Sequence, residues 1–322
     1  MTFRLRSIWN KAVTSRYVLS DGWLRDYRDI PVIINNYNRL SDPVHLLAWL
    51  RRAGTRRIVI VDNASDYPPL LAWYATLGGF SGDLRVIRLA SNIGAKAIWD
   101  LNLLQSLSIF TEYVYTDSDV IPANYCPFDA IGHLQAILKT NISTQKVGLG
   151  LRLDNLPANY RHRDAVLLWE QQFWRRPAAP GLMFAEVDTT FALYRPQTGH
   201  QQSPDNLRTT WPYVAEHRGW YSDSANATEE DAHYARTARR DVTSWSGGAL
   251  RDELAKALAN IQRPSLLQLH NGRDAWPGWD QGDGKDFSEL ETGSYGVVIR
   301  AIGRFRVFTG SPMDVGWCIF LP

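Results

Sequence analysis

The hydrophobic positions of the chain fall into short runs separated by amphipathic stretches, most regularly before residue 125. Apolar runs rich in β-branched or aromatic residues predict buried strands at Pro31–Ile34, Arg57–Asp62, Leu84–Leu89 and Tyr113–Thr116. The stretches between them, such as VHLLAWLRRAG and LLAWYATL, predict helices. Nearly all-apolar strands that alternate with helices indicate a mostly parallel central sheet with helices on both faces. The sequence therefore predicts an α/β fold.

The first predicted helix carries signals at both of its ends. Asp42 is a candidate N-cap, Pro43 suits the first helical position, and Gly54 suits the position after the end. A later helix is predicted at Ala95–Leu107, after the loop SNIG. We expect that segment to form a single helix.

The second half of the chain is patterned less regularly. The predicted elements are a strand at Lys146–Leu153, a helix at Asp164–Arg175, a strand at Glu186–Tyr194, and helices at Ala227–Arg240 and Leu250–Asn260. Further strands are predicted at Ser265–His270, Tyr295–Ile302 and Phe305–Thr309. The expected organisation is an N-terminal extension (1–29), a main domain (30–245) with halves 30–125 and 126–245, and a small C-terminal extension (246–322) of open role.

Composition narrows the class of protein. The 35 basic and 33 acidic residues give a formal net charge of +2, too small for a general nucleic-acid binder. Cys126 and Cys318 lie far apart without metal-type spacing, which favours a reducing compartment over a disulfide scaffold. No stretch approaches the roughly 18 apolar residues of a membrane span, so we expect a soluble protein. The 13 Trp residues are explained mostly by packing, although their rings also suit sugars.

Polar residues follow each predicted strand of the first half. They are Asn35–Arg39, Asp62–Asn63, Ser91–Asn92 and Asp117–Asp119. In parallel sheets, ligands bind beyond the carboxyl ends of the strands. We therefore expect these groups to gather at one edge and to form the functional site.

Asp117 and Asp119 stand one residue apart where a strand ends, so both carboxylates can reach one cation. Mg²⁺ and Mn²⁺ prefer oxygen ligands and bridge to substrate phosphates, which suits a nucleoside diphosphate. Taken alone, this pair of aspartates is more typical of a solvated loop. The polar residues at the neighbouring strand ends favour the interpretation that the pair binds a metal. Asp62 is placed to accept from a base N–H or a ribose hydroxyl, or else serves as a turn residue. Asn92 and Lys96 lie at the start of a predicted helix, where they could contact the ribose or a phosphate. The alternative for Lys96 is a solvated helix residue.

The series PVIINNYNRL, IVIVDNAS, LASNIGAKAIWD and YVYTDSDVIP, over roughly residues 30–125, resembles the nucleotide-binding half of GT-A glycosyltransferases, especially bacterial family-2-like members. The resemblance implies a Rossmann-like, mostly parallel central sheet flanked by helices. It also implies transfer of a sugar from a nucleotide-sugar, in the first place a UDP-sugar, to a glycan or lipid-linked acceptor, with Mn²⁺ or Mg²⁺. The implied setting is cell-surface polysaccharide synthesis, in the cytoplasm or peripherally at the inner membrane face, without nucleic acid.

Carried over to matching positions, the resemblance implies a set of nucleotide-sugar-binding residues. They are Asn36, Arg39, Asp62, Asn92, Lys96 and Asp117. Asp62 would contact the nucleobase, while Asn92 and Lys96 would lie near the ribose or the diphosphate. Asp117 and Asp119 would hold the metal, Asp119 more directly.

The second half matches the family more loosely, through FAEVDTTFALYRP and EHRGWYSDSANATEEDAHYAR. An inverting transfer needs a carboxylate base. Glu230 and Asp231 match the family's acidic motif, and Asp188 is the competitor, although acidic residues in a first helical turn also suit the helix dipole. The third metal ligand is His217 or His270, and the anomeric outcome stays open.

Two other classes of protein stay open. A sugar nucleotidyltransferase shares the sheet and the metal carboxylates, but it needs a Gly-rich loop after the first strand, and INNYNRL contains no glycine. A non-catalytic carbohydrate-binding protein on the same fold would use the Trp residues for recognition, and the intact DSD argues against it. The absence of a Walker A motif and of a complete G-x-G-x-x-G argues against ATPases and dehydrogenases.

Overall fold

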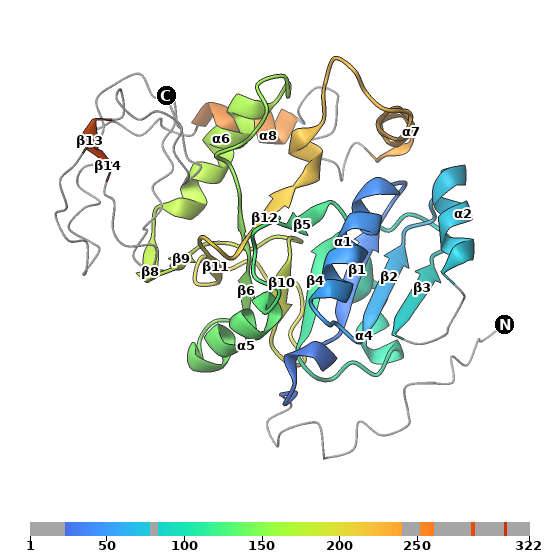
Figure 1. Cartoon of the computed structure of the whole chain (residues 1–322), viewed down its shortest axis with the longest axis horizontal. Helices are drawn as coiled ribbons and strands as arrows, with labels where there is room; N and C mark the ends of the chain where they lie inside the picture. The colour runs from blue at the N-terminus through green and yellow to red at the C-terminus, as the bar shows by residue number, and fades with distance from the viewer. Residues whose placement is uncertain (1–22, 78–82, 240–251, 261–284, 287–305, 308–322) are drawn as a thin grey trace.

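The computed structural model describes residues 23–77, 83–239, 252–260, 285–286 and 306–307. Within these residues, the centre of the molecule is a 9-stranded sheet with helices packed on both faces (Figure 1). No helix in this described part is both long and apolar enough to cross a bilayer.

The first half of the sheet is parallel, as the sequence predicts. It contains β1 (Val32–Asn36), β2 (Ile58–Asp62), β3 (Leu84–Arg88) and β4 (Tyr113–Asp117), in the order β3-β2-β1-β4. The helices α1 (Ser41–Arg52) and α2 (Pro68–Thr76) follow β1 and β2 along the chain. The strand predictions for this half are confirmed, and with them the α/β fold class.

Each face of this half of the sheet has its own hydrophobic core. Because side chains alternate along a strand, β1 buries Ile34 on one face and Ile33 on the other. Ile34 belongs to a cluster with Leu46 of α1. Ile33 belongs to a cluster with Tyr115 of β4 and Ile98 of α3 (Ala97–Asp100). Burial on both faces explains why β1, β2 and β4 are nearly all apolar up to their polar ends.

The prediction of a single helix over Ala95–Leu107 is wrong. The segment forms α3 and then a second short helix, α4 (Leu103–Ser106). Asn102 lies between them with a left-handed φ of 50°. One residue in this conformation interrupts the helical hydrogen-bond pattern, and asparagine tolerates it better than most residues.

The predicted ends of α1 are half right. Asp42 is not the N-cap, because the helix begins at Ser41 and Leu40 precedes it without a side-chain cap. Asp42 therefore lies inside the first turn of α1. At the other end, Gly54 follows the helix with a φ of 75°, the left-handed conformation that suits glycine after a helix.

The second half of the sheet is mixed and built from short strands. β10 (Ala192–Tyr194) pairs antiparallel with both β4 and β6 (Lys146–Gly148). Beyond β6 the sheet continues with β11 (Leu207–Thr209), then β9 (Leu182–Phe184) and finally β8 (Pro177–Ala179) at its edge. A separate 3-stranded sheet of the described residues contains β5 (Val120–Pro122), β12 (Val214–His217) and β7 (Gly150–Leu151).

Two strand predictions in this half are too long. The segment Lys146–Leu153 splits at Leu149 into β6 and β7, which belong to different sheets. Gly150 permits this crossing, because a Cβ there would collide with the carbonyl oxygen of Thr209. Of the segment Glu186–Tyr194, β10 is the strand, and residues 186–191 form a loop.

In the second half, the predicted helices Asp164–Arg175, Ala227–Arg240 and Leu250–Asn260 correspond to α6 (Arg163–Glu170) continued by η3 (Gln171–Trp174), to α7 (Glu229–Thr237) and to α8 (Asp252–Asn260). The sequence does not predict the helices α5 (Ala130–Thr140) and η4 (Arg218–Tyr221). The short helix η2 (Tyr27–Asp29) precedes β1, and β13 (Lys285–Asp286) pairs with β14 (Arg306–Val307). The predicted strands Ser265–His270 and Tyr295–Ile302 lie outside the described residues, and Phe305–Thr309 is described at β14 alone.

Candidate functional site

The register of the parallel strands brings their polar ends together. Asn36 is paired with Asp62, Asp62 is paired with Arg88, and Asn35 is paired with Asp117. These residues form one row across the carboxyl edge of β3, β2, β1 and β4. The predicted gathering of the strand ends is confirmed.

A chain of polar side chains runs along this edge. Asn63 accepts from the backbone N–H of Ile93 at 3.0 Å and donates to Asn35 Oδ1 at 2.5 Å. Asn35 donates to Asp117 Oδ1 at 3.1 Å, and Thr189 donates to Asp117 Oδ2 at 2.5 Å. Asn35 and Asn63 belong to the strand-end groups that the sequence predicts to gather at this edge, although the resemblance assigns them no role. The sequence does not mark Thr189 as a site residue, because it lies in a loop of the second half, far from the strand ends along the chain.

Asp117 ends β4 and lies partly buried against this chain. Burial raises the pKa of Asp117 to about 8, and the charge of Asp119 acts in the same direction. The hydrogen bonds from Thr189 and Asn35 oppose this rise in pKa. Two carboxylates that repel one another in this way are stabilised together by a cation.

Asp119 lies in the turn between β4 and β5 and faces His217 at the end of β12. The pairing of β5 with β12 places His217 opposite Val120, and His217 Nδ1 lies 3.7 Å from Asp119 Oδ2. The imidazole stacks on Trp220 with 4.6 Å between ring centroids. Its Nδ1 is buried and has no hydrogen-bond partner within the described part of the chain. A Cβ on Gly219 would lie 3.3 Å from this nitrogen and 3.4 Å from Asp119 Oδ2, so the glycine leaves space beside both groups.

These groups suit a divalent cation. Mn²⁺ accepts carboxylate oxygen and imidazole nitrogen, and the unpartnered Nδ1 of His217 is a free donor of the right kind. Among the described residues, no group of three or more His, Cys, Asp or Glu side chains is arranged to hold a metal. Asp119 and His217 would therefore supply two ligands. This number suits a cation whose other ligands are substrate phosphates and water. His270, the other predicted histidine, lies outside the described residues.

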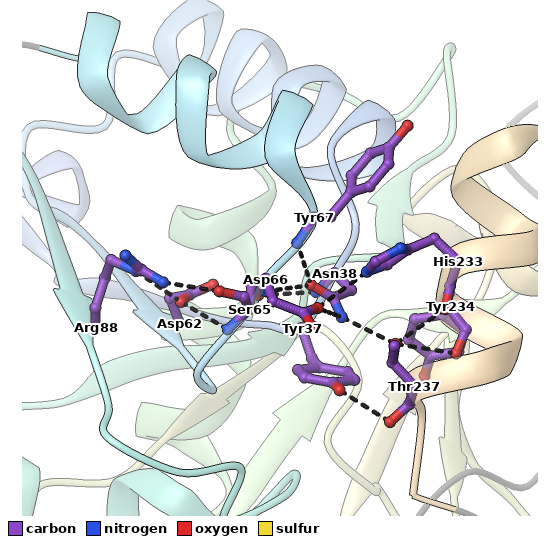
Figure 2. A network of polar contacts seen from close by, with 10 residues as sticks. All are labelled: Tyr37, Asn38, Asp62, Ser65, Asp66, Tyr67, Arg88, His233, Tyr234 and Thr237. Atoms are coloured by element: carbon purple, nitrogen blue, oxygen red, sulfur yellow. Dashed lines mark hydrogen bonds and ion pairs between the residues drawn. The ribbon is translucent and has the colours of Figure 1, made fainter.

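Asp62 has very different surroundings. It is 0% exposed, and its Oδ1 accepts from the hydroxyl of Tyr74 at 3.2 Å. Its Oδ2 accepts from the backbone N–H of Ser65 at 3.1 Å and from Arg88 Nε at 3.2 Å (Figure 2). Arg88 also donates to the carbonyl oxygen of Ser65 at 2.7 Å. The turn role considered for Asp62 is present, and its contact with a nucleobase stays a prediction that requires Arg88 to move.

Asn38 connects the loops after β1 and β2 to α7. It accepts from the backbone N–H of Asp66 at 2.8 Å, and its amide donates to Asp66 Oδ1 at 2.8 Å and to Thr237 Oγ1 at 2.9 Å. His233 Nε2 also lies 2.9 Å from Asp66 Oδ1. The hydroxyl of Tyr37 donates to the carbonyl oxygen of Thr237 at 2.9 Å. Figure 2 shows these contacts, which hold α7 against the carboxyl edge of the sheet.

The first turn of α7 carries Glu230 and Asp231, the predicted catalytic bases. Glu230 accepts from the backbone N–H and the hydroxyl of Ser41, at 3.1 and 2.8 Å, and so caps α1. Asp231 forms a capping box with Thr228 and accepts from Arg39 Nη1 at 2.6 Å. Burial opposes the effect, but the hydrogen bonds from Thr228 and Arg39 hold the pKa of Asp231 below its usual value. Both carboxylates have structural partners, and their catalytic role stays a prediction.

Asp188, the competing base, lies in the loop before β10 and is 66% exposed. Gln202 donates to its Oδ1 at 3.3 Å, and His200 Nε2 lies 3.8 Å from the same oxygen. The charge of Asp188 acts on Asp117, so the two residues are neighbours at the edge. The structure thus brings Asp188 to the site without a strong partner.

Asp42, predicted as an N-cap, lies at this site instead. Burial raises the pKa of Asp42 to about 7. The charges of Asp119 and Glu230 raise it further, whereas Arg39 and Arg218 lower it. The carboxyl group of Asp42 therefore lies among residues from the turn after β4, the loop after β1, α7 and η4.

The remaining predicted residues lie around the edge. Asn36 is 0% exposed and donates to the carbonyl oxygen of Arg39 at 2.9 Å. Asn92 is partly buried, and its carbonyl oxygen accepts from Arg239 at 3.1 Å. Lys96 is exposed at the N-cap position of α3. Their contacts with a nucleotide stay predictions.

The fold and this edge define an α/β protein whose candidate site is built from carboxylates and amides at the ends of parallel strands. No family model matches the chain, and no curated protein matches it in sequence. Among solved structures it is similar to TarS 1–349 of S. aureus, with 15% identity and a TM-score of 0.36, over 64% of this chain and 68% of that one.

Two further solved structures are similar. GalNAc-T7 with UDP, GalNAc and Mn²⁺ matches at 12% identity and a TM-score of 0.36, over 77% of this chain and 54% of that one. This chain thus spans about half the length of GalNAc-T7. A Bacillus anthracis protein described as a glucose-1-phosphate thymidylyltransferase matches at 9% identity and a TM-score of 0.32, over 76% of this chain and 94% of that one. At these scores we base no conclusion about function on the likeness.

Proposed function

We propose that the chain is a metal-dependent glycosyltransferase that moves a sugar from a nucleotide-sugar to a glycan or lipid-linked acceptor. The observation that carries this proposal is the pair Asp119 and His217, 3.7 Å apart, whose imidazole Nδ1 lacks a hydrogen-bond partner within the described residues. The pair lies beside the carboxyl group of Asp117, which the charge of Asp119 disfavours in its ionised form. It also lies at the carboxyl edge of parallel strands, where such sheets bind ligands.

Each end of the edge has a proposed role. Asp119 and His217 would hold a Mn²⁺ or Mg²⁺ ion, with Asp117 behind them, and the ion would supply positive charge to the leaving diphosphate. The nucleobase would lie at the other end, over Asp62 and Arg88.

The finer parts of the proposal rest on the sequence resemblance. They are a UDP-sugar as donor, a role in cell-surface polysaccharide synthesis, and a location in the cytoplasm or peripherally at the inner membrane face. Analogy between folds supports a pathway only as an association, and it does not identify the donor sugar or the acceptor.

Thermal unfolding with UDP and Mn²⁺ tests the proposal. At ligand concentrations of about 100 times Kd, the wild-type protein gains about 2.7 kcal/mol of stability. We expect Asp119→Ala to lose the Mn²⁺-dependent part of this gain. Asp164→Ala is the matched control, because Asp164 is 92% exposed on α6, and it keeps the gain. The absence of a shift for the wild type, or an equal shift for Asp119→Ala, contradicts the proposal.

Hydrolysis of a panel of nucleotide-sugars with Mn²⁺ identifies the donor without knowledge of the acceptor. A glycosyltransferase releases the nucleoside diphosphate from its own donor at a low rate. A sugar nucleotidyltransferase releases pyrophosphate from a nucleoside triphosphate and a sugar phosphate. A non-catalytic carbohydrate-binding protein releases neither product.

A further inference from the structure

The transfer needs a group that takes the proton of the acceptor hydroxyl, and the two bases predicted from the acidic motif are occupied. Glu230 accepts from Ser41, and Asp231 accepts from Arg39 at 2.6 Å. Although burial opposes the effect, the hydrogen bonds from Thr228 and Arg39 hold the pKa of Asp231 below its usual value, which weakens it as a proton acceptor, and the oxygens of Glu230 are already engaged by Ser41. The base is then expected to be another carboxylate near Asp119 that lacks such bonds.

Asp42 meets this requirement. Within the described residues its carboxylate forms no hydrogen bond or ion pair, and no hydrogen bond contributes to its pKa. It follows Ser41 in the first turn of α1, and α1 packs against β5, the strand that begins directly after Asp119. The contact of Ser41 with Glu230 fixes this turn against α7. Asp42 is thus held in place by its backbone while its carboxylate stays available.

Asp188 is the competitor, and it lies on a different side of the edge. Its charge acts on the buried Lys146, and it lies 3.8 Å from His200. These neighbours belong to the face of the sheet that α3 covers, since His200 packs on Trp99 of α3. Asp42 instead lies on α1, which packs against β5, and β5 begins directly after Asp119, the residue proposed to hold the cation at the bond that breaks.

We infer that Asp42 is the catalytic base of the proposed transfer, an inference that rests on the proposed function. The hydroxyl proton of the acceptor passes to a carboxylate oxygen of Asp42, and the hydroxyl oxygen forms a bond to the anomeric carbon of the donor sugar. The bond from that carbon to the diphosphate oxygen breaks, and its electron pair leaves with the diphosphate. This single displacement inverts the configuration at the anomeric carbon.

Donor hydrolysis with the full chain tests the role of Asp42, because water replaces the acceptor and gives its proton to the same base. The probe is the nucleotide-sugar that the wild type hydrolyses with Mn²⁺. We expect Asp42→Asn to lower kcat by about 100-fold or more, a typical contribution of a general base. The UDP- and Mn²⁺-dependent thermal shift stays at the wild-type value. Asp188→Asn and Glu230→Gln test the rival carboxylates, and Asp164→Asn is the remote control.

Three results would overturn the inference. The first is Asp42→Asn with kcat within about threefold of the wild type. The second is loss of the Mn²⁺-dependent shift in Asp42→Asn, which would make Asp42 a metal ligand. The third is a product sugar that keeps the donor's anomeric configuration, measured by NMR. If Asp42→Asn does not fold, Asp42→Ala with added formate replaces it, and the absence of formate-dependent rescue counts against the inference.

The failure of the proposed function looks different from the failure of this inference. A wild-type protein that neither binds UDP with Mn²⁺ nor hydrolyses any nucleotide-sugar removes the proposed function and the role of Asp42 together. If the wild type hydrolyses its donor and Asp42→Asn hydrolyses it equally well, the role of Asp42 alone is removed.

Discussion

Asp62 ends β2, and Asp119 lies in the turn after β4, at the same carboxyl edge of the sheet. Their side chains differ in burial and in the number of hydrogen bonds that they accept. Asp62 is 0% exposed, and Tyr74, Ser65 and Arg88 all donate to it. Asp119 is 22% exposed, and His217 approaches it at 3.7 Å, too far for a hydrogen bond. A strand-end aspartate is thus fully hydrogen-bonded within the fold at one end of the edge and available as a metal ligand at the other.

This difference indicates which end of the edge would be stabilised by a bound cation. A carboxylate with several donors is stabilised within the fold and needs nothing further. A carboxylate among other carboxylates, beside a buried nitrogen without a partner, costs stability until a cation binds. Violations of this kind are expected at functional sites, so the Asp119 end is the stronger functional candidate.

The largest expected effect of a single substitution on stability is at the Asp62 end. Asp62→Ala leaves the Ser65 N–H and the Tyr74 hydroxyl buried without their acceptor. Each buried unsatisfied group costs about 1–3 kcal/mol, so we expect the free energy of unfolding to fall by about 3 kcal/mol. Chemical denaturation of the metal-free protein measures this change.

Asp119→Ala is the matched variant for this comparison. It removes the charge that repels the carboxylates of Asp117 and Asp42. We therefore expect the free energy of unfolding to stay within about 0.5 kcal/mol of the wild type or to rise. Equal losses of stability in Asp62→Ala and Asp119→Ala would show that the two ends do not differ in this way.

The second expected effect is a pH dependence that arises at the Asp119 end. Burial, with the charge of Asp119, raises the pKa of Asp117 from 3.8 to about 8. Between these values the folded state keeps a proton that the unfolded chain has lost, so the free energy of unfolding falls as the pH rises. The slope is at most about 1.4 kcal/mol per pH unit.

Denaturation at several values between pH 5 and pH 8, in EDTA, measures this slope. We expect Asp117→Asn to reduce the slope, because asparagine does not titrate, while Asp42, whose pKa is raised to about 7, still contributes. We expect saturating Mn²⁺ to reduce it as well. A wild-type protein whose stability is constant or rises across this range would contradict the repulsion that distinguishes the two ends.

The fold of the first half could be predicted because each strand is encoded locally. The strands β1, β2 and β4 are mostly apolar runs that are buried on both faces, and such runs can be recognised without knowledge of distant contacts. Asn102 breaks the predicted helix with one left-handed residue, which helical patterning does not reveal. The segment Lys146–Leu153 has the alternating pattern of one strand, and its division between two sheets depends on the approach of Thr209 to Gly150.

The candidate site could be predicted in part for the same reason. Asp117 and Asp119 are recognisable because the strand and its polar end are adjacent in sequence. The position of His217 depends on the pairing of β5 with β12, strands of 3 and 4 residues that carry little signal of their own. The engagement of Glu230 by Ser41 depends on the docking of α7, which Asn38 and Thr237 secure from distant parts of the chain.

The smallest expected effect tests how Asp62 is held. Tyr74→Phe removes a hydroxyl that donates to Asp62 Oδ1 at 3.2 Å and accepts from Asn36 at 2.8 Å. The ring keeps its packing, and Asp62 keeps its bonds from Ser65 and Arg88. We therefore expect the free energy of unfolding to fall by about 1 kcal/mol, the net value of a typical hydrogen bond, as measured by denaturation. The Mn²⁺-dependent response to UDP persists, because Asp119 and His217 are unchanged. A loss of the Mn²⁺-dependent part of that response in Tyr74→Phe would show that the two ends of the edge are coupled, and it would contradict the separation of the hydrogen-bonded Asp62 end from the metal-binding Asp119 end.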